Sequence, residues 1–209
     1  MSEVWLTSDS HFGHRNILKY HRHEFLSEQE QENIMLDVDF EVSRRSADLM
    51  DNTIIDNINS MVGPNDTLWH LGDFVYKSEA SLKSYRNRIR CNNINFIMGN
   101  HDNREEILDS GCFNEVYDLH EACFPGGIRI VLCHYAMKIW PRSHRGALHL
   151  FGHSHGSLDE DPFSKSMDVG LDTNNYLPYN LTTVLELLKQ KEWVPVDHHG
   201  DRSRNRKRI

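Results

Sequence analysis

Five short apolar runs, each followed at once by a cluster of Asp, His or Asn, constrain the fold of this chain more than any other feature. Each run has the length and composition of a buried β-strand. Strand ends in layered α/β folds present side chains into a common crevice on a rigid frame. The sequence therefore predicts five strands whose ends bring the clusters together. The runs cover residues 4–6, 67–71, 95–98, 128–132 and 148–151, and the clusters after them are Asp9-Ser10-His11, Gly72-Asp73, Gly99-Asn100-His101-Asp102, Cys133-His134 and Gly152-His153-Ser154-His155.

These clusters supply the ligand atoms that divalent metal ions take from proteins. Carboxylate oxygen, amide oxygen and neutral imidazole nitrogen suit hard and borderline ions, and two-metal hydrolase sites combine them with open positions for solvent. Thiolate is scarce, since four cysteines are spread singly with no Cys-x-x-Cys pair. Taken alone, Gly72-Asp73 is an ordinary turn sequence, and a single His after a strand is usually packed or exposed. The joint order of the five clusters favours a two-metal hydrolase site.

In order and spacing, the clusters resemble the calcineurin-like metallophosphoesterases, whose pattern is D-x-H, G-D, G-N-H-D/E, H and G-H-x-H. Every block is present, and the resemblance spans residues 4 to 185. Local details are similar to the small stand-alone microbial and phage phosphoesterases of that superfamily. These details are the segment from Ser8 to His14, Leu71-Gly72-Asp73-Phe74 and Asp168-Val169-Gly170.

The resemblance implies two metal ions and a metal-ligand role for seven residues. A carboxylate suits the position between the ions, because its two oxygens and its charge screen two cations about 3.5–4 Å apart. A bridging water or hydroxide would be the nucleophile, since coordination lowers the pKa of water from roughly 16 to about 7. Mn²⁺ is the first choice for activity, and Zn²⁺, Fe²⁺, Ni²⁺ or Co²⁺ suit the same donors. By resemblance, Asp9, His11 and His155 hold one ion, Asn100, His134 and His153 hold the other, and Asp73 bridges them.

By the same resemblance, His101 lies outside the set of metal ligands and acts as the general acid that protonates the leaving oxygen, or holds the phosphoryl oxygen. Imidazole suits this role because both of its protonation states are accessible near neutral pH. Asp102 follows directly and is assigned to the catalytic group with His101. It could fix either the His101 ring or the loop that carries it, and adjacency in sequence does not decide between them.

Substrate contacts are expected from residues outside the shared blocks. His14 lies just beyond Asp9 and His11 and could line the pocket, although an ordinary loop histidine is the alternative. Residues 137–145 include Arg142 and Arg145 beside an aromatic side chain, a combination that could hold a phosphate or stack a base. The alternative for this segment is a solvated connection. Residues 21–24 are a second candidate source of a specific pocket.

For the fold, the resemblance implies an α/β architecture, a four-layer αββα sandwich of two mixed β-sheets flanked by helices. One domain over residues 1–195 is expected, because no linker or repeat interrupts it. Apolar spacing predicts helices over 43–62, 78–90 and 181–191, and residues 125–127 (Pro-Gly-Gly) predict a hairpin turn. Residues 196–209 form a basic tail, read either as a solubilising end or as a tether for a polyanion.

Composition limits the partners of this 209-residue chain. A formal net charge of −8 and a pI near 5.9 argue against a broad electropositive surface for nucleic acid. No run approaches the roughly 18 apolar residues of a membrane helix, and no secretory signal begins the chain. We therefore expect a cytoplasmic protein with no membrane partner.

Three functions remain open at this stage. The first is a phosphodiesterase acting on a nucleotide-type substrate, a nucleic-acid end or another small phosphodiester. The second is a phosphomonoesterase with the same site. The third, from a different class, is a non-catalytic metal-binding scaffold, which loss of His101 or of several ligands would indicate; none of these residues is missing.

Overall fold

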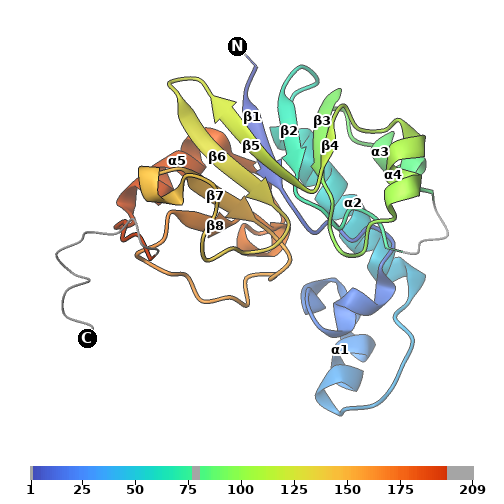
Figure 1. Ribbon diagram of the computed structural model, residues 1–209. Coiled ribbons are helices and arrows are strands. Elements are labelled where there is room, and N and C mark those ends of the chain that lie inside the picture. Colours follow the sequence, from blue (N-terminus) through green and yellow to red (C-terminus); the bar gives the residue numbers. More distant parts are fainter. Residues whose placement is uncertain (1, 77–80, 197–209) are drawn as a thin grey trace.

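The computed structural model describes residues 2–76 and 81–196, and within them the chain forms two mixed β-sheets (Figure 1). The five-stranded sheet has the order β4-β3-β2-β1-β9, with β9 antiparallel to β1 and the other neighbours parallel. The four-stranded sheet has the order β5-β6-β7-β8, with only β5 and β6 antiparallel. The strands are β1 (Val4–Thr7), β2 (Thr67–His70), β3 (Asn93–Ile97), β4 (Val116–Tyr117), β5 (Leu119–Phe124), β6 (Ile128–Cys133), β7 (Leu148–Phe151), β8 (Ser166–Asp168) and β9 (Tyr179–Asn180).

The two sheets share one apolar cluster, which forms the centre of the molecule. Leu6 and Trp69 of the first sheet belong to it together with Leu132 and Leu150 of the second. Fully burying a side chain of this size contributes about 1.5–3 kcal/mol, so the shared cluster holds the two sheets together. It thereby fixes the strand ends of one sheet relative to those of the other.

Helices flank the first sheet on its other face. The predicted helix over 43–62 is α2 (Arg44–Met61), and Ser43 caps it by accepting a hydrogen bond from the Ser46 N–H. Met50, Ile54 and other apolar residues of α2 pack into the second large cluster of the core. The remaining helices are α1 (Glu28–Met35), α3 (Leu82–Arg86), α4 (Arg104–Ser110) and α5 (Leu181–Gln190), with 3₁₀ helices η1 (Arg15–Lys19), η2 (His23–Phe25), η3 (Ser143–Arg145) and η4 (Leu171–Thr173).

The predicted fold class is confirmed, because two mixed sheets with flanking helices form an α/β layered fold. The hairpin turn at 125–127 joins β5 to β6, and α5 matches the helix predicted over 181–191. Of the helix predicted over 78–90, the described residues contain α3, while 78–80 lie outside them. The basic tail also lies outside the described residues beyond Val196.

The outer face of the second sheet has a different cover. Val131 of β6 packs there with Trp140 and Ala147, whose segment folds back over the sheet. The Trp140 indole N–H donates to the Ala147 carbonyl (2.8 Å), which closes this segment. Among the described residues, no helix is long and apolar enough to cross a membrane.

Residues 15–43 form a small lobe that contains η1, η2 and α1. It follows directly after the turn at the end of β1, and Figure 1 shows α1 projecting away from both sheets. Glu30 ties the lobe to the rest of the domain, because its carboxylate accepts hydrogen bonds from Ser27, from the Ser43 N–H (2.6 Å) and from the Ser46 hydroxyl. The starts of α1 and α2 thus share one buried carboxylate.

This carboxylate should make the stability of the lobe depend on pH. Burial alone would raise the pKa of Glu30, but the hydrogen bonds from Ser43, Ser46 and Ser27 outweigh it and lower the pKa to about 2. Because the folded-state pKa is depressed, the stabilisation is fully present above the unfolded value of about 4.3 and is lost as pH falls toward 2. Glu30→Gln turns one acceptor into a donor facing other donors and should cost about 1–3 kcal/mol at pH 7.

Urea unfolding at pH 7 and at pH 3 measures the loss of unfolding free energy in Glu30→Gln relative to the wild type. The exposed Glu186→Gln on α5 is the matched control. The difference in unfolding free energy between Glu30→Gln and the wild type should be smaller at pH 3 than at pH 7. An equal difference in unfolding free energy at both pH values would contradict the role of the Glu30 carboxylate as a hydrogen-bond acceptor that is lost on protonation.

Candidate metal centre

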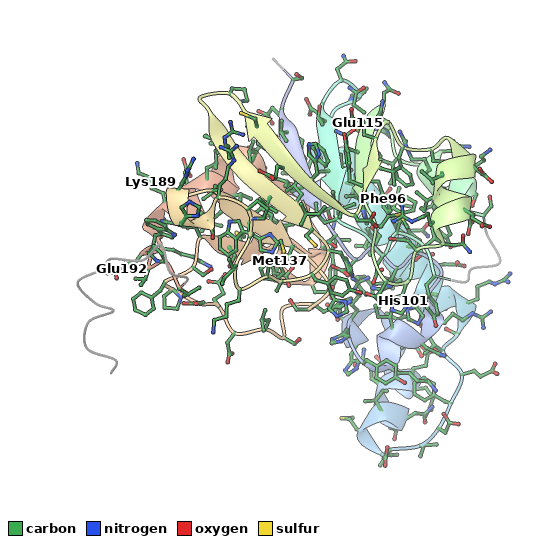
Figure 2. All side chains as sticks on the ribbon, in the orientation of Figure 1. Phe96, His101, Glu115, Met137, Lys189 and Glu192 are labelled. Atoms are coloured by element: carbon green, nitrogen blue, oxygen red, sulfur yellow. The ribbon has the colours of Figure 1, made fainter. Side chains whose placement is uncertain are left out.

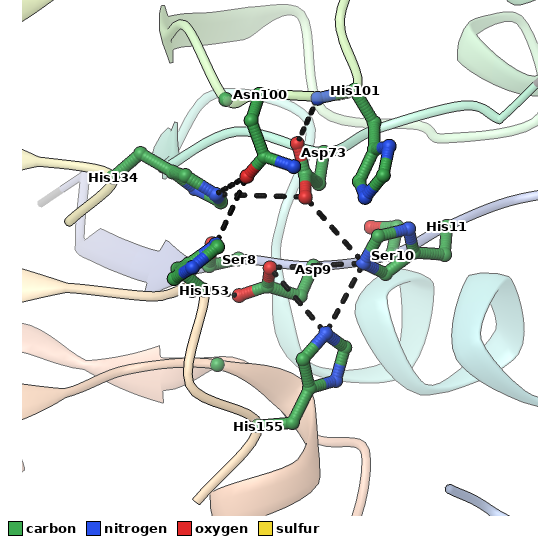
Figure 3. A network of polar contacts seen from close by, with 12 residues as sticks. Ser8, Asp9, Ser10, His11, Asp73, Asn100, His101, His134, His153 and His155 are labelled. Atoms are coloured by element: carbon green, nitrogen blue, oxygen red, sulfur yellow. Dashed lines mark hydrogen bonds and ion pairs between the residues drawn. The ribbon is translucent and has the colours of Figure 1, made fainter. Parts of the chain in front are cut away.

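The turns after β1 and β2 bring two ligand clusters together at one edge of the first sheet. Because these strands are parallel neighbours, both end at the same edge. The turns remain hydrogen-bonded beyond the strands: the Asp9 N–H donates to the Gly72 carbonyl (3.0 Å) and the His11 N–H donates to the Asp73 carbonyl (2.9 Å). Asp9 and Asp73 are both buried, and their carboxylates lie close together (Figure 3).

The second sheet contributes its ligands in the same way. β6 and β7 are parallel, and the Gly152 N–H donates to the His134 carbonyl (2.9 Å) beyond their ends. The His153 N–H then donates to Asp9 Oδ2 (2.9 Å), which joins the two sheets at the site. Gly152 is required by this close approach, since a Cβ there would lie 2.0 Å from Ser8 Oγ and 2.5 Å from Asp9 Oδ2.

Five of the expected ligands have a left-handed backbone. Such conformations in non-glycine residues cost of the order of 1–3 kcal/mol each and persist where the surrounding structure fixes them. Their concentration at one place is therefore a sign of function as well as of tight turns. The φ angles are 60° for Asp9, 47° for His11, 57° for Asp73, 66° for His153 and 48° for His155.

Among the described residues, two groups of side chains could each hold a metal ion, with ligand atoms within 4.8 Å of one another. The first group is Asp9, His11 and His155. The Nε2 atoms of its two histidines face each other at 3.2 Å, and each lies 3.8 Å from Asp9 Oδ1. Asp9 Oδ1 is buried and has no hydrogen-bond partner among the described residues.

The second group is Asp73, His134 and His153, and Asn100 joins it. Asn100 Oδ1 lies 3.0 Å from His134 Nε2 and 2.9 Å from His153 Nδ1. Asp73 Oδ2 lies 3.5 Å from His134 Nε2 and 3.6 Å from His11 Nε2, so this carboxylate lies between the two groups. The structure thus brings all seven predicted ligands together in the two predicted sets (Figure 3).

The chemistry of the donor set fits a cation. His134 Nδ1 lies 2.7 Å from the Leu71 carbonyl, which only accepts, so Nδ1 carries a proton. In neutral His134 the Nε2 lone pair would then face two further acceptors, the oxygens of Asn100 and Asp73. Converging acceptors repel one another unless a proton or a metal cation lies between them. The residues present therefore fit the metal ions implied by the resemblance.

The charges of the groups follow from burial and from one another. Burial raises the pKa of Asp9 to about 6 despite His155 and His134, and burial lowers the pKa of His11 to about 2. For His134 the carboxylates of Asp73 and Asp9 outweigh burial and raise the pKa to about 9. A metal cation would compete with the His134 proton for the same pair of electrons, so binding of an ion should release a proton.

His101 lies beside the two groups without joining either. Its N–H donates to Asp73 Oδ1 (2.9 Å), and its exposed ring lies 5.5 Å from the His11 ring. Figure 2 shows His101 toward the end of the first sheet opposite Glu115.

Asp102 fixes the loops and not the His101 ring. Its Oδ2 accepts from the N–H groups of Asp73 and Gly99, both at 2.8 Å, and its Oδ1 accepts from the Phe74 N–H (3.0 Å). The sequence left open whether Asp102 fixes the His101 ring or the loop that carries it, and the geometry selects the loop. Asp102 is therefore a positioning residue, and its assignment to the catalytic group with His101 is corrected.

Of the three predicted substrate contacts, the structure brings only His14 to the site. The His14 ring stacks on Tyr76 (centroids 3.8 Å apart) and lies 5.6 Å from the His11 ring, while the Tyr76 ring meets His101 edge-on at 4.9 Å. Tyr76 was not predicted from the sequence. Its place three residues after Asp73 was the available signal.

Arg142 and Arg145 lie elsewhere, which corrects the prediction that they contact the substrate. They line a cleft of about 550 Å³ with Gly127 at the start of β6, whereas His134 follows the end of that strand. Six residues of strand span about 20 Å. The segment after His134 folds back over the outer face of the sheet and carries both arginines away from the ligands. Lys189 lines the same cleft, and Figure 2 shows it far from His101.

Comparisons with known proteins identify relatives but no function. No protein-family model matches the chain. A curated relative, the uncharacterized protein MJ1445 of Methanocaldococcus jannaschii, is 29% identical over 201 residues, which cover 93% of this chain and 96% of the relative. The crystal structure of a protein of unknown function, AQ665 from Aquifex aeolicus, matches with a TM-score of 0.60 and 22% identity, over 90% of this chain and 100% of that one. The structural match supports the fold alone.

The centre predicts a metal-dependent gain in stability. Adding Mn²⁺ or Zn²⁺ to metal-stripped protein should raise the midpoint of thermal unfolding, because an ion at 100 times its Kd stabilises the folded state by about 2.7 kcal/mol. Asp73→Asn should remove most of this shift, since the amide keeps the shape of the side chain but loses the charge between the two groups. Calorimetry with and without the ion measures it.

Asp109→Asn, the same change on the exposed face of α4, serves as the control. It should keep the full metal-dependent shift. An equal shift in both variants would rule out Asp73 as a shared ligand.

Proposed function

We propose that this chain is a dinuclear metal-dependent phosphoesterase of the calcineurin-like type, acting on a phosphodiester. The observation that carries the proposal is the geometry of Asp73: one oxygen faces both ligand groups, and the other accepts the His101 N–H. The Asp73 carboxylate thereby connects the two metal-binding groups to each other and to the loop that carries the general acid, His101. Bound ions would supply Lewis-acid activation of water and of the phosphoryl oxygens.

The residues of the chain would perform the remaining steps. The attacking water would lose one proton to solvent. As its oxygen bonds to phosphorus, the bond from phosphorus to the leaving oxygen breaks with its electron pair on that oxygen. His101 would donate the proton which the leaving oxygen needs and would then be reprotonated from solvent. The exposed His101 ring is accessible to a substrate. Asp73 fixes the backbone of His101 by accepting its N–H, and the Tyr76 ring contacts the His101 ring edge-on. Asp102 would keep the Asp73 and Gly99 turns in register during the reaction.

An open site supports a diester substrate. His101 and His153 are both exposed, so a group on either side of the phosphate has room. A diester with an alkoxide leaving group also gains most from a general acid, because an alkoxide is a poor leaving group without a proton. A nucleotide or a nucleic-acid end has this chemistry. Preference for a monoester in the assay below would replace the diester by the second function, with the same residues in the same roles.

Hydrolysis of two diesters by the metal-loaded protein tests the proposal. His101→Ala should lower the rate by about 10²–10⁴ on a diester with an alkyl leaving group. The loss should be smaller with bis-p-nitrophenyl phosphate, whose leaving group needs little protonation. Metal content should stay unchanged, because His101 is not a ligand.

The control is His23→Ala, an exposed histidine on η2, which should hydrolyse both diesters at the wild-type rate. Turnover by wild type that is lost on chelation and restored by Mn²⁺ would support the proposal. An absence of turnover of diesters and monoesters with two ions demonstrably bound would favour the non-catalytic scaffold.

A further inference from the structure

His155 has a hydrogen-bond partner on the side of its ring that faces away from Asp9 and His11. Its Nδ1 lies 2.7 Å from Asp172 Oδ2, and a carboxylate oxygen accepts, so Nδ1 carries the proton. The Nε2 lone pair is then left to face His11 and Asp9. A carboxylate behind a histidine in this way fixes both the tautomer and the orientation of the ring for a metal ion in front of it.

Asp172 is held in turn by a buried arginine from the lobe. Arg22 Nε donates to Asp172 Oδ1 and Arg22 Nη2 donates to Asp172 Oδ2, both at 2.7 Å. This bidentate pairing fixes the plane of the carboxylate as well as its position. Only 4% of Arg22 is exposed, so its guanidinium does not reach solvent to bind a substrate.

Arg22 also supports the turn that carries Asp9 and His11. Its Nη2 donates to the Asp9 carbonyl (2.5 Å) and its Nη1 donates to the Ser10 carbonyl (3.2 Å). One guanidinium therefore holds two ligand-bearing parts of the first group, the turn after β1 directly and His155 through Asp172. Arg22 is itself in the left-handed region (φ 62°), between η1 and η2, and its Cζ lies 5.6 Å from the centre of the Tyr176 ring.

The second group has a looser support. A backbone carbonyl braces His134, and His153 is exposed. Within residues 2–76 and 81–196, no carboxylate hydrogen-bonds to the far side of either ring. The two groups of the centre are thus unequal.

We propose that Arg22 and Asp172 are positioning residues that make the Asp9–His11–His155 group the tighter of the two metal-binding groups. The inference rests on the metal centre of the proposed function, but it does not require hydrolysis. Within residues 21–24, which the sequence suggested as a source of the substrate pocket, it assigns Arg22 a buried positioning role for metal binding.

Asp172→Asn tests the inference, because its NH₂ group must replace one acceptor. If the NH₂ group introduced at position 172 faces Arg22, a donor lies against the donors of the guanidinium. If it faces His155, it favours the tautomer with the proton on Nε2, and Nε2 then has no lone pair for a metal ion. Titration calorimetry of the metal-stripped protein with Zn²⁺ or Mn²⁺ should show one of two binding events weakened by about 10–100-fold. The other event should change less than about threefold, and Asp109→Asn should match the wild type.

The tautomer gives a readout that general loosening of the structure would not produce. Imidazole ¹⁵N spectra of the metal-free wild type should show His155 protonated on Nδ1, with the signal assigned from His155→Gln. Asp172→Asn should shift it toward protonation on Nε2. The double variant Arg22→Gln/Asp172→Asn removes both buried charges together, so it guards against unfolding of the single variant and should lose the same binding event.

Wild-type affinity for both ions in Asp172→Asn or in the double variant, with the tautomer unchanged, would overturn the inference. It would also fall if the wild type binds no divalent ion. Loss of the tight event in a protein whose wild type binds two ions but hydrolyses no ester would uphold the inference while the phosphoesterase proposal fails.

Discussion

Two buried carboxylates at the ends of adjacent parallel strands, Asp9 and Asp73, create the electrostatic demand on which the rest of the site depends. Carboxylates removed from water are costly unless cations or donors satisfy them. Here the surrounding imidazoles turn nitrogen atoms toward the carboxylate oxygens, and two of these histidines have their other nitrogen committed, His134 to a carbonyl and His155 to Asp172. The arrangement gathers acceptors around two points, so a divalent cation bound at each point would satisfy them better than the chain can alone.

Such convergence requires the two sheets to meet closely, and the backbone reflects the constraint. Between the sheets, a Cβ on Gly152 would lie 2.0 Å from Ser8 Oγ. Within the first sheet, a Cβ on Gly99 would lie 2.2 Å from Asp73 Oδ1. The left-handed turns at the ligands add a cost that only a fixed framework sustains. That framework is the apolar cluster shared by the sheets, which holds the strand ends in place. Apolar packing between the two sheets thus sustains the strained backbone of the turns that carry the ligands.

The strands and the polar clusters after them could be predicted because their signals are local: an apolar run ends, and a polar cluster follows within three residues. The division of the ligands into two sets came from the family resemblance. The positioning residues could not, since Arg22 and Asp172 are 150 residues apart and only folding places them together. Asp102 shows a related limit, because adjacency to His101 says nothing about which way a carboxylate points. The helix α1 was missed for another reason: its sequence EQEQENIM buries only Glu30, so no apolar stripe marks it.

The lobe is physically coupled to the metal centre through Arg22. If the lobe opened locally, Asp172 would lose its buried partner and His155 would lose the carboxylate that orients it. Under the proposal for the first group, a state with an open lobe would bind an ion there less well. By linkage, an ion bound there must stabilise the closed lobe by the same free energy. Residues 15–43 are therefore connected to the candidate metal centre and are not an isolated appendage. If the first group binds an ion as proposed, the folding of these residues and the occupancy of the site would be linked through the guanidinium group of Arg22.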